Sequence, residues 1–309
     1  MINIQYDQFL LRTVLVAKRA GDAILEVYNS DFAVEQKDDK SPLTLADKRS
    51  HEVIVGMLKK RIKNENAECR DDYSSMPILS EEGRDIPFED RRKWEYYWLV
   101  DPLDGTKEFV KRNGEFTVNI ALMQRNRPVL GCIYVPVQDI FYFAAEGLGS
   151  YKLEDSEKVT DDLSVKELFD ISRKLPLKKQ EKNDTSCDNK KTNGENTPLT
   201  IIGSRSHTSK EVSEFVEHIK KQFGGVEFIS AGSSLKFCLV AEGKADIYPR
   251  FGPTMEWDTA AGHVIVEQAS GEVIDVHTKA PLQYNKRELL NPFFIVSREH
   301  LSSELEYVC

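Results

Sequence analysis

The sequence lacks a long apolar run, which excludes the simplest membrane-bound arrangements. No stretch reaches the roughly 18 consecutive apolar residues that suggest a transmembrane helix. Residues 1–12 mix apolar positions with Asp7 and other polar residues, which predicts the opening of an amphipathic helix rather than a signal peptide. We therefore expect a soluble protein that has no membrane as its partner.

Paired cysteines and excess positive charge are missing as well. The five cysteines are scattered, odd in number and form no CxxC pair, which is typical of reduced thiols and predicts a cytoplasmic location. The net charge of −9 gives no general attraction for a nucleic acid polymer. The negative net charge still allows a small anionic substrate, because metal ions and a local basic patch can reverse the charge inside one cleft. No protein partner is predicted.

The 309 residues carry a mixed pattern of helices and strands, enough for one large domain or two packed lobes. Helical spacing of apolar residues or helix-ending signals predict helices over 6–28, 46–62, 209–223, 234–242 and 259–268, and a short one at the end of the chain. Strand-like runs lie at 76–79, 96–100, 117–123, 129–135, 140–145, 199–202, 226–229, 245–248 and 292–296. This mixture without a fixed repeat predicts an α/β or α+β layered sandwich.

The composition changes between the two halves of the chain. Residues 178–196 contain no aromatic residue and few apolar ones, so burial cannot offset the entropy cost of ordering them. We predict an N-terminal α+β lobe over 1–154, which binds metal, and a C-terminal α/β lobe over 199–309, which binds substrate. Between them we predict an insertion over 155–198 that is largely flexible around 178–196.

The strongest local pattern is an apolar run that ends in two acids three residues apart, Asp101 and Asp104. Proline cannot continue a central strand, so we expect the chain to turn at Pro102. The turn would gather both carboxylates and the Leu103 carbonyl around one point. Hard oxygen ligands of this kind are what Mg²⁺ prefers.

The residues after the acids favour an anion next to the metal. Gly105 permits a backbone shape that other residues resist, and the N–H groups of Gly105 and Thr106 can then face a phosphate. An ordinary surface turn built around an aspartate is the alternative for this segment.

Three further acids lie next to or within predicted helices and strands. Taken alone, each acid could have a purely structural role instead of a functional one. Glu81 follows an apolar run, where a solvated loop is the alternative. Asp258 lies at or just before a helix start, where it could act as an N-cap. Asp47 lies in the first turn of a helix, where the helix dipole also favours an acid.

Taken together, these patterns resemble a known family. Six segments occur in the family's order: LTLADKRSH, LSEEG, WLVDPLDGTKEFVKRNGEFTVNIAL, GSRSH, AGSSLKFCLVAEGKADIYPRFGP and EWDTAAGHVIVEQASGEV. The chain resembles the lithium-sensitive, magnesium-dependent phosphatase superfamily of inositol monophosphatase and fructose-1,6-bisphosphatase, and within it the 3′(2′),5′-bisphosphate nucleotidases of the CysQ type. The likeness covers nearly the whole chain except 155–198. It implies a sugar-phosphatase-like αβαβα sandwich of two packed lobes.

The resemblance implies a magnesium site with two or three ions. Glu81, Asp101 and the Leu103 carbonyl would hold one ion. Asp101, Asp104 and Asp258 would hold a second, and a third, weaker ion would share Glu81. Lithium is expected to inhibit. Four carboxylates with three Mg²⁺ ions leave a charge of +2, which suits a phosphate dianion.

The resemblance also implies catalytic and substrate contacts. Thr106 and Asp47 would activate the attacking water, because a threonine hydroxyl needs an acceptor for its own proton, and Glu81 would act in catalysis beside them. The implied substrate contacts are Gly105, Thr106, Ser204, His207, Gly232, Ser233, Lys236, Arg250 and Asp258. Lys236 and Arg250 would meet the non-scissile phosphate, although a solvated helix position and an ordinary salt bridge explain them equally well.

The predicted reaction is hydrolysis of the 3′-phosphate of 3′-phosphoadenosine 5′-phosphate to give AMP and phosphate, with the 5′-phosphosulfate analogue as a second substrate. It would serve sulfur metabolism. One alternative is a phosphatase for inositol monophosphate or 1,4-bisphosphate, which would share every metal ligand. An alternative of another class is a non-catalytic protein that binds a phosphorylated metabolite. The presence of Asp47, Thr106 and the four metal carboxylates argues against it.

Overall fold

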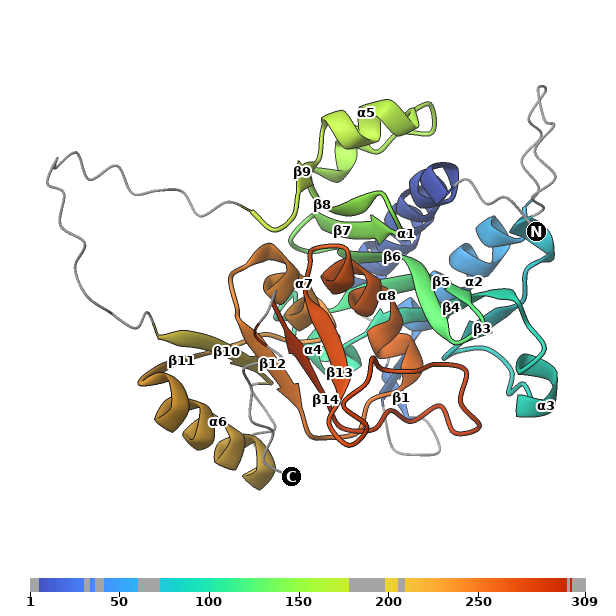
Figure 1. The fold of residues 1–309 in the computed structure, drawn as a ribbon. Helices are drawn as coiled ribbons and strands as arrows, with labels where there is room; N and C mark the ends of the chain where they lie inside the picture. The colour runs from blue at the N-terminus through green and yellow to red at the C-terminus, as the bar shows by residue number, and fades with distance from the viewer. Residues whose placement is uncertain are drawn as a thin grey trace, which may run out of the picture.

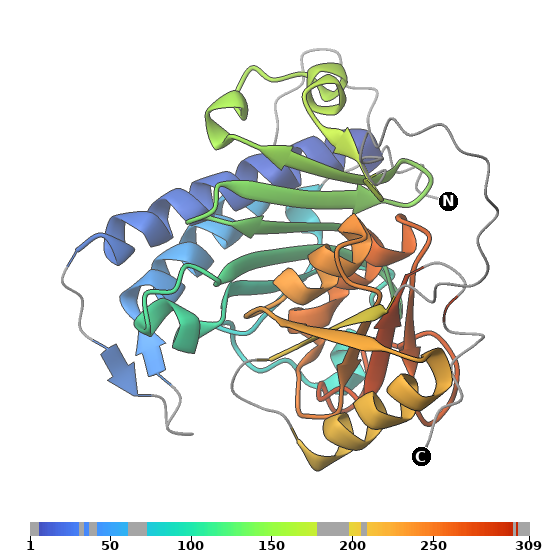
Figure 2. The ribbon, with the colours of Figure 1, turned by 90° about the vertical axis from the view of Figure 1, so that its left-hand side faces the viewer.

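The computed structural model describes residues 6–30, 34–36, 42–60, 73–177, 198–204, 209–298 and 301. Within these ranges the chain forms five layers, seen edge-on in Figure 2: helices, a large sheet, two central helices, a smaller sheet and an outer helix. The predicted αβαβα sandwich is confirmed. The stretch predicted to be flexible, 178–196, His207 and the predicted terminal helix lie outside the described residues.

The first layer consists of two amphipathic helices, α1 (Tyr6–Tyr28) and α2 (Leu45–Leu58). Residues of α1 at helical spacing, such as Phe9, Leu10 and Val14, are buried against the large sheet, so apolar burial fixes this layer. The prediction of a helix over 6–28 is confirmed. None of the helices in the described ranges is long and apolar enough to cross a membrane.

The large sheet has seven strands in the order β3-β4-β5-β6-β7-β8-β9. β3 runs parallel to β4 and the other neighbouring pairs are antiparallel. The strands are β3 (Ile78–Ser80), β4 (Tyr96–Asp104), β5 (Thr117–Gln124), β6 (Arg127–Val135), β7 (Ile140–Ala145), β8 (Gly149–Glu154) and β9 (Arg173–Lys174). The short helices α3 (Phe88–Arg91) and α4 (Thr106–Val110) flank β4, and β1 (Val34–Gln36) pairs with β2 (Pro42–Thr44).

The remaining layers come from the C-terminal part of the chain (Figure 1). The helices α7 (Leu235–Glu242) and α8 (Glu256–Glu267) form the central layer, and α6 (Lys210–Phe223) covers the outer face of the smaller sheet. That sheet has the order β11-β10-β12-β14-β13, with β10 (Leu199–Gly203), β11 (Val226–Ser230), β12 (Ile247–Arg250), β13 (Glu272–Asp275) and β14 (Phe294–Ser297). One hydrophobic cluster joins the large sheet, the central helices and the smaller sheet.

The large sheet of the first lobe gains a strand beyond the predicted boundary at residue 154. Residues 155–177 form the 3₁₀ turn η2 (Ser156–Lys158), α5 (Val165–Asp170) and β9, which adds a strand to the large sheet. Ser164 and Glu167 close a capping box at the start of α5. Val159 and Leu168 are buried in the hydrophobic cluster of the first lobe, so this part of the predicted insertion packs with that lobe.

A buried ion pair joins the large sheet to the central helices. Lys152 Nζ on β8 lies 3.0 Å from Glu242 Oε1 at the end of α7, and the Tyr142 hydroxyl donates to Glu242 Oε2 at 2.8 Å. Burial alone would raise the pKa of Glu242, but hydrogen bonds from Lys244, Tyr142 and Lys152 outweigh it and lower that pKa. This network ties the two lobes together on the β8 side of the large sheet.

Candidate metal centre and substrate pocket

The acidic segment of β4 is shaped by a bulge rather than by a turn. The strand continues through Pro102 to Asp104, so the expected end of the strand at Pro102 is not observed. Asp101 pairs with Asn119 and Asp104 pairs with Thr117, which leaves one extra residue on β4. A bulge tolerates proline and re-aims the neighbouring side chains. The buried Leu103 lies in this bulge, and its N–H donates to Asp101 Oδ1 at 3.0 Å.

Glu81 reaches the same place from the parallel neighbour of β4. Ser80 pairs with Val100, and the Glu81 N–H donates to the Val100 carbonyl at 3.1 Å. Glu81 and Asp101 each directly follow one member of the Ser80–Val100 pair, so they are neighbours at the point where β3 ends. Acidic side chains at the carboxyl ends of parallel strands are a common way to build a site.

Acids from both lobes lie close enough to repel one another. The pKa of Asp101 is raised well above its ordinary value, first by burial and then by the charges of the acids around it: Glu81, Asp104, Asp258 and Asp47. The pKa of Asp258 is also raised, by burial and then by Asp104. The structure thus brings together the predicted acids Asp47, Glu81, Asp101, Asp104 and Asp258.

These acids suit a hard divalent cation by their chemistry. The donor set consists of carboxylates and one backbone carbonyl, which are the ligands that Mg²⁺ takes in proteins, and a cation would relieve the mutual repulsion. Asp104 Oδ2 is 2.7 Å from Ser234 Oγ, and Asp258 Oδ2 accepts from the Met255 N–H at 2.9 Å. No group of three acidic, histidine or cysteine side chains in the described ranges is already gathered as a metal cage.

Two of the acids occupy the first turns of helices. Asp258 is the third residue of α8, because the helix begins at Glu256 and not at Thr259 as predicted. Asp47 is the third residue of α2 and is 1% exposed. Thr106, its predicted catalytic partner, is the half-buried first residue of α4.

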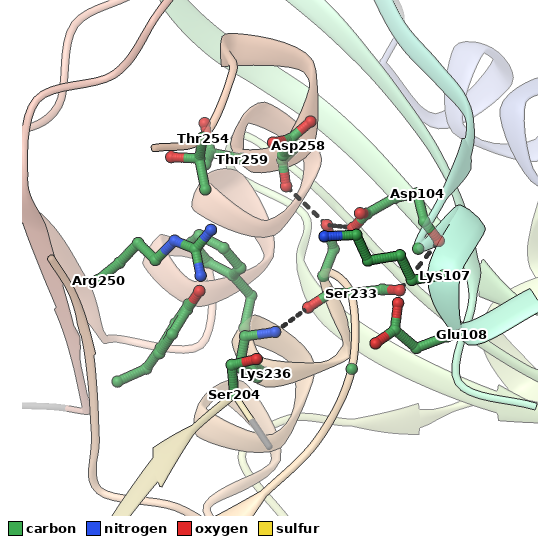
Figure 3. A pocket seen from close by; sticks show the side chains of 15 residues that line it. Asp104, Lys107, Glu108, Ser204, Ser233, Lys236, Arg250, Thr254, Asp258 and Thr259 are labelled. Atoms are coloured by element: carbon green, nitrogen blue, oxygen red, sulfur yellow. Dashed lines mark hydrogen bonds between the residues drawn. The ribbon is translucent and has the colours of Figure 1, made fainter. Parts of the chain in front are cut away.

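A cavity of about 140 Å³ opens beside Asp104 and Asp258, between α4 of the first lobe and elements of the second (Figure 3). Seven of the predicted substrate residues line it: Gly105, Ser204, Gly232, Ser233, Lys236, Arg250 and Asp258. Thr106 is not among the described residues of its wall, although both its neighbours along the chain are.

Two glycines allow the loops of the two lobes to touch at this cavity. Gly105 has a φ of 90°, and a Cβ there would lie 2.0 Å from Ser233 Oγ. A Cβ on Gly232 would lie 2.8 Å from Glu108 Cγ, and the Gly232 N–H donates to Glu115 Oε2 at 2.8 Å. Both positions therefore need glycine, Gly105 also because of its positive φ.

The two predicted cations differ in what they contact. Lys236 is buried, and its Nζ donates to the Ser233 carbonyl at 2.6 Å and lies 3.4 Å from the Ala231 carbonyl, which holds this turn (Figure 3). Burial lowers the pKa of Lys236 to about 8. Arg250 donates through Nη2 to the Pro253 carbonyl at 2.7 Å. Its Nε, like Thr254 Oγ1, is buried without a hydrogen-bond partner in the part of the chain that the structure describes.

Other lining residues were missed by the sequence analysis: Lys107, Glu108, Ser234, Phe237, Tyr248, Thr254 and Thr259. Lys107 and Glu108 directly follow the segment of the metal acids, and Ser234 lies inside AGSSLK, so their motifs offered a signal. Thr254 lies between two motifs and offered none.

A larger cavity, of about 360 Å³, lies at α3 and the β5–β6 hairpin. Only one of the residues that line it, Glu95, is acidic. Because the acids converge elsewhere, volume alone would select the wrong site.

The fold and its acid cluster define a class of protein, and comparison with known proteins names it. The chain matches the inositol monophosphatase family over residues 5–305 and belongs to this family. It is 43% identical over 286 residues to the 3′(2′),5′-bisphosphate nucleotidase CysQ of Escherichia coli K12, which covers 91% of this chain and 96% of that protein. It is 39% identical to the CysQ of Buchnera aphidicola over 88% of this chain and 86% of the relative.

Solved structures agree with this assignment. The crystal structure of CysQ from Bacteroides thetaiotaomicron, a bacterial member of the family, superposes with a TM-score of 0.80 at 43% identity, over 96% of this chain and all of that one. The suhB protein of Bartonella henselae has a TM-score of 0.64 at 21% identity over 95% of each chain, which shows the shared fold alone. The predicted resemblance to the family and to CysQ proteins is confirmed.

Proposed function

We propose that this chain is a magnesium-dependent phosphomonoesterase that removes the 3′-phosphate of 3′-phosphoadenosine 5′-phosphate and gives AMP and phosphate. The 5′-phosphosulfate analogue is proposed as a second substrate. The observation that carries the proposal is the convergence of acids from both lobes beside a cavity whose wall also holds Lys236 and Arg250. The 43% identity to 3′(2′),5′-bisphosphate nucleotidases supports the nucleotide as substrate.

The residues that would hold two or three Mg²⁺ ions are Glu81, Asp101, the Leu103 carbonyl, Asp104 and Asp258. When bound, Mg²⁺ supplies positive charge beside the phosphate and lowers the pKa of water. Lithium is expected to inhibit. The raised pKa values of Asp101 and Asp258 support a cation here, because it would stabilise carboxylates that burial and then neighbouring acids disfavour in their charged form.

The chain's own residues then orient the phosphate and move the proton. The backbone N–H groups of Gly105 and Thr106 would donate to the scissile phosphate. The attacking water would pass its proton to Thr106 Oγ1, whose own proton moves to Asp47. The ribose 3′-oxygen leaves in line with the attack and takes up a proton from solvent water to give the 3′-hydroxyl. The burial of Asp47 near Asp101 supports a carboxylate that serves the site rather than the surface.

The second lobe would hold the rest of the nucleotide. Arg250 Nε and Thr254 Oγ1 lack partners within the described ranges and belong to residues of the cavity wall, so a polar group of a ligand would satisfy them. We assign Arg250 and the remaining N–H of Lys236 to the 5′-phosphate. The other proposed contacts with the nucleotide are Ser204, His207, Gly232, Ser233 and Asp258.

The proposed setting is the cytoplasm, with the small nucleotide as the partner and a role in sulfur metabolism. Cys132 and Cys238 are buried thiols outside any disulfide, which suits a reducing compartment.

A substrate panel tests the proposal. Phosphate release is measured from 3′-phosphoadenosine 5′-phosphate, inositol 1-phosphate and inositol 1,4-bisphosphate, with Mg²⁺, with EDTA, and with Mg²⁺ plus Li⁺. We expect the highest kcat/KM for the nucleotide, none in EDTA and inhibition by Li⁺. A higher kcat/KM for either inositol phosphate would refute the nucleotide assignment, and binding without turnover of any substrate would favour the non-catalytic alternative.

A matched pair of variants tests the pocket. Arg250→Ala should raise the KM for the nucleotide about 10- to 100-fold, because it removes hydrogen bonds to a charged group. Arg287→Ala removes an exposed arginine that pairs with Glu89 of α3 and does not line the cavity, so it should leave the KM unchanged. Equal KM values for the two variants would contradict the assignment of Arg250.

A further inference from the structure

Ser234 occupies the N-cap position of α7 but does not cap its helix. Serine at this position usually accepts a hydrogen bond from a backbone N–H of the first turn. Here no such bond forms. Instead, Ser234 Oγ lies 2.7 Å from Asp104 Oδ2 and 2.6 Å from the backbone oxygen of Asp258. The hydroxyl therefore lies between the acidic segments of the two lobes.

Asn119 fixes which way this hydroxyl points. Its Nδ2 donates to Ser234 Oγ at 2.9 Å, and both side chains are buried. A hydroxyl has one proton and two lone pairs, so the amide occupies a lone pair and leaves the proton for Asp104 or the Asp258 carbonyl. An ionised carboxylate is the stronger acceptor, which assigns the proton to Asp104.

We propose that Ser234, oriented by Asn119, is a positioning residue for the divalent cation at the metal centre. It holds Oδ2 of Asp104 and leaves the other carboxylate oxygen for the cation. This inference rests on the metal centre of the proposed function, but not on the identity of its substrate.

The physical consequence is a higher affinity for the cation. Partners that orient a ligating side chain in advance remove the entropy cost of ordering it on binding, and their loss typically weakens metal binding about 10- to 100-fold. Asp104 without Ser234 would keep its charge but lose its fixed orientation. The expected defect is therefore in Mg²⁺ affinity more than in kcat at saturating Mg²⁺.

The test compares Ser234→Ala with a control that removes another buried serine hydroxyl. Ser150 on β8 is fully buried, and its Oγ has no hydrogen-bond partner within the described ranges, so Ser150→Ala is matched in chemistry and burial. Mg²⁺ binding is measured by titration calorimetry without substrate. The Mg²⁺ concentration for half-maximal phosphate release is measured separately. We expect 10- to 100-fold weaker Mg²⁺ binding for Ser234→Ala and wild-type binding for Ser150→Ala.

A second variant tests the role of Asn119. If the amide acts through the hydroxyl, Asn119→Ala should weaken Mg²⁺ binding, and the double variant should bind no more weakly than Ser234→Ala alone. Should Ser234→Ala fail to fold by circular dichroism in EDTA, Ser234→Cys replaces it. The thiol is close in shape and a weak donor, so a loss in the same direction is expected.

Three results would overturn the inference: wild-type Mg²⁺ affinity in the folded Ser234 variant, an equal loss in Ser150→Ala, or full additivity of the Ser234 and Asn119 effects. Failure of the wild type to hydrolyse the nucleotide would overturn the proposed substrate and leave this inference standing. Nucleotide turnover by the wild type together with unchanged Mg²⁺ affinity in Ser234→Ala would support the proposed substrate and overturn this inference.

Discussion

Gly131 on β6 sets how closely α8 approaches the large sheet, so its replacement by alanine should disturb the metal centre from a distance. A Cβ at Gly131 would lie 2.6 Å from the Ala261 carbonyl oxygen and 2.7 Å from Val264 Cγ1. The carbonyl belongs to the helix backbone, so no side-chain rotation relieves the clash. Restoring an ordinary 3.4 Å contact requires α8 to retreat by roughly 0.8 Å.

The retreat would carry Asp258 with it, because Asp258 lies three residues before Ala261 on the same helix. Overpacking of this kind typically costs about 1–3 kcal/mol of stability. A misplacement near 1 Å in a catalytic constellation can cost about 100-fold in rate. For Gly131→Ala we therefore expect the free energy of unfolding to fall by about 2 kcal/mol and kcat/KM to fall about 10- to 100-fold.

Denaturant unfolding in EDTA measures the first effect, and Mg²⁺-dependent phosphate release well below the unfolding midpoint measures the second. Gly56→Ala is the control, because Gly56 lies inside α2 with no atom within 4 Å of the added methyl group. It should raise stability by about 0.5–1 kcal/mol and leave kcat/KM unchanged. A Gly131→Ala protein as stable and active as the wild type would refute the reasoning.

Three further predictions concern charge and backbone. Glu242→Gln should lower the free energy of unfolding by about 3 kcal/mol at pH 7, because it leaves Lys152 with a weaker buried partner. Because the pKa of Glu242 is lowered, this contribution is fully present above the ordinary glutamate pKa of about 4.3 and is lost as the pH falls through the lowered pKa. The stability difference between the two proteins should therefore shrink as the pH falls below about 4.3, and a constant difference would contradict the prediction. Asp101→Asn should raise the unfolding midpoint in EDTA, since it removes a buried, repelled charge, and should abolish Mg²⁺-dependent turnover; a lower midpoint would count against the acid cluster. Gly105→Ala should cost about 1–2 kcal/mol at a φ of 90°, measured by unfolding, and should raise the KM by displacing Ser233; wild-type values for both would show that the loop adapts.

Local periodicity was sufficient to predict most of the fold. The first helix was predicted over its full length, because its apolar face repeats without interruption and its burial needs no distant information. The start of α8 was placed three residues late. Met255 precedes it in extended conformation without the signature of a polar cap, so no residue type marked the boundary.

Tertiary context decided the features that the sequence could not supply. Pro102 was expected to end a strand, but pairing with Asn119 and Thr117 across a bulge carries the strand past it. Ser234 was predicted only as the first residue of a helix, and its actual contacts come from β4 and α8, far away along the chain. The acids themselves could be identified from the sequence, since their chemistry is local, whereas their convergence could be proposed only through the family resemblance.

The central claim is that acids from the two lobes hold divalent cations next to the phosphate pocket. Anomalous diffraction from crystals soaked with Mn²⁺ in place of Mg²⁺ locates such ions directly. The account predicts at least two peaks bordered by Glu81, Asp101, Asp104 and Asp258. Peaks at other positions only, in a protein that is active with Mn²⁺, would contradict it.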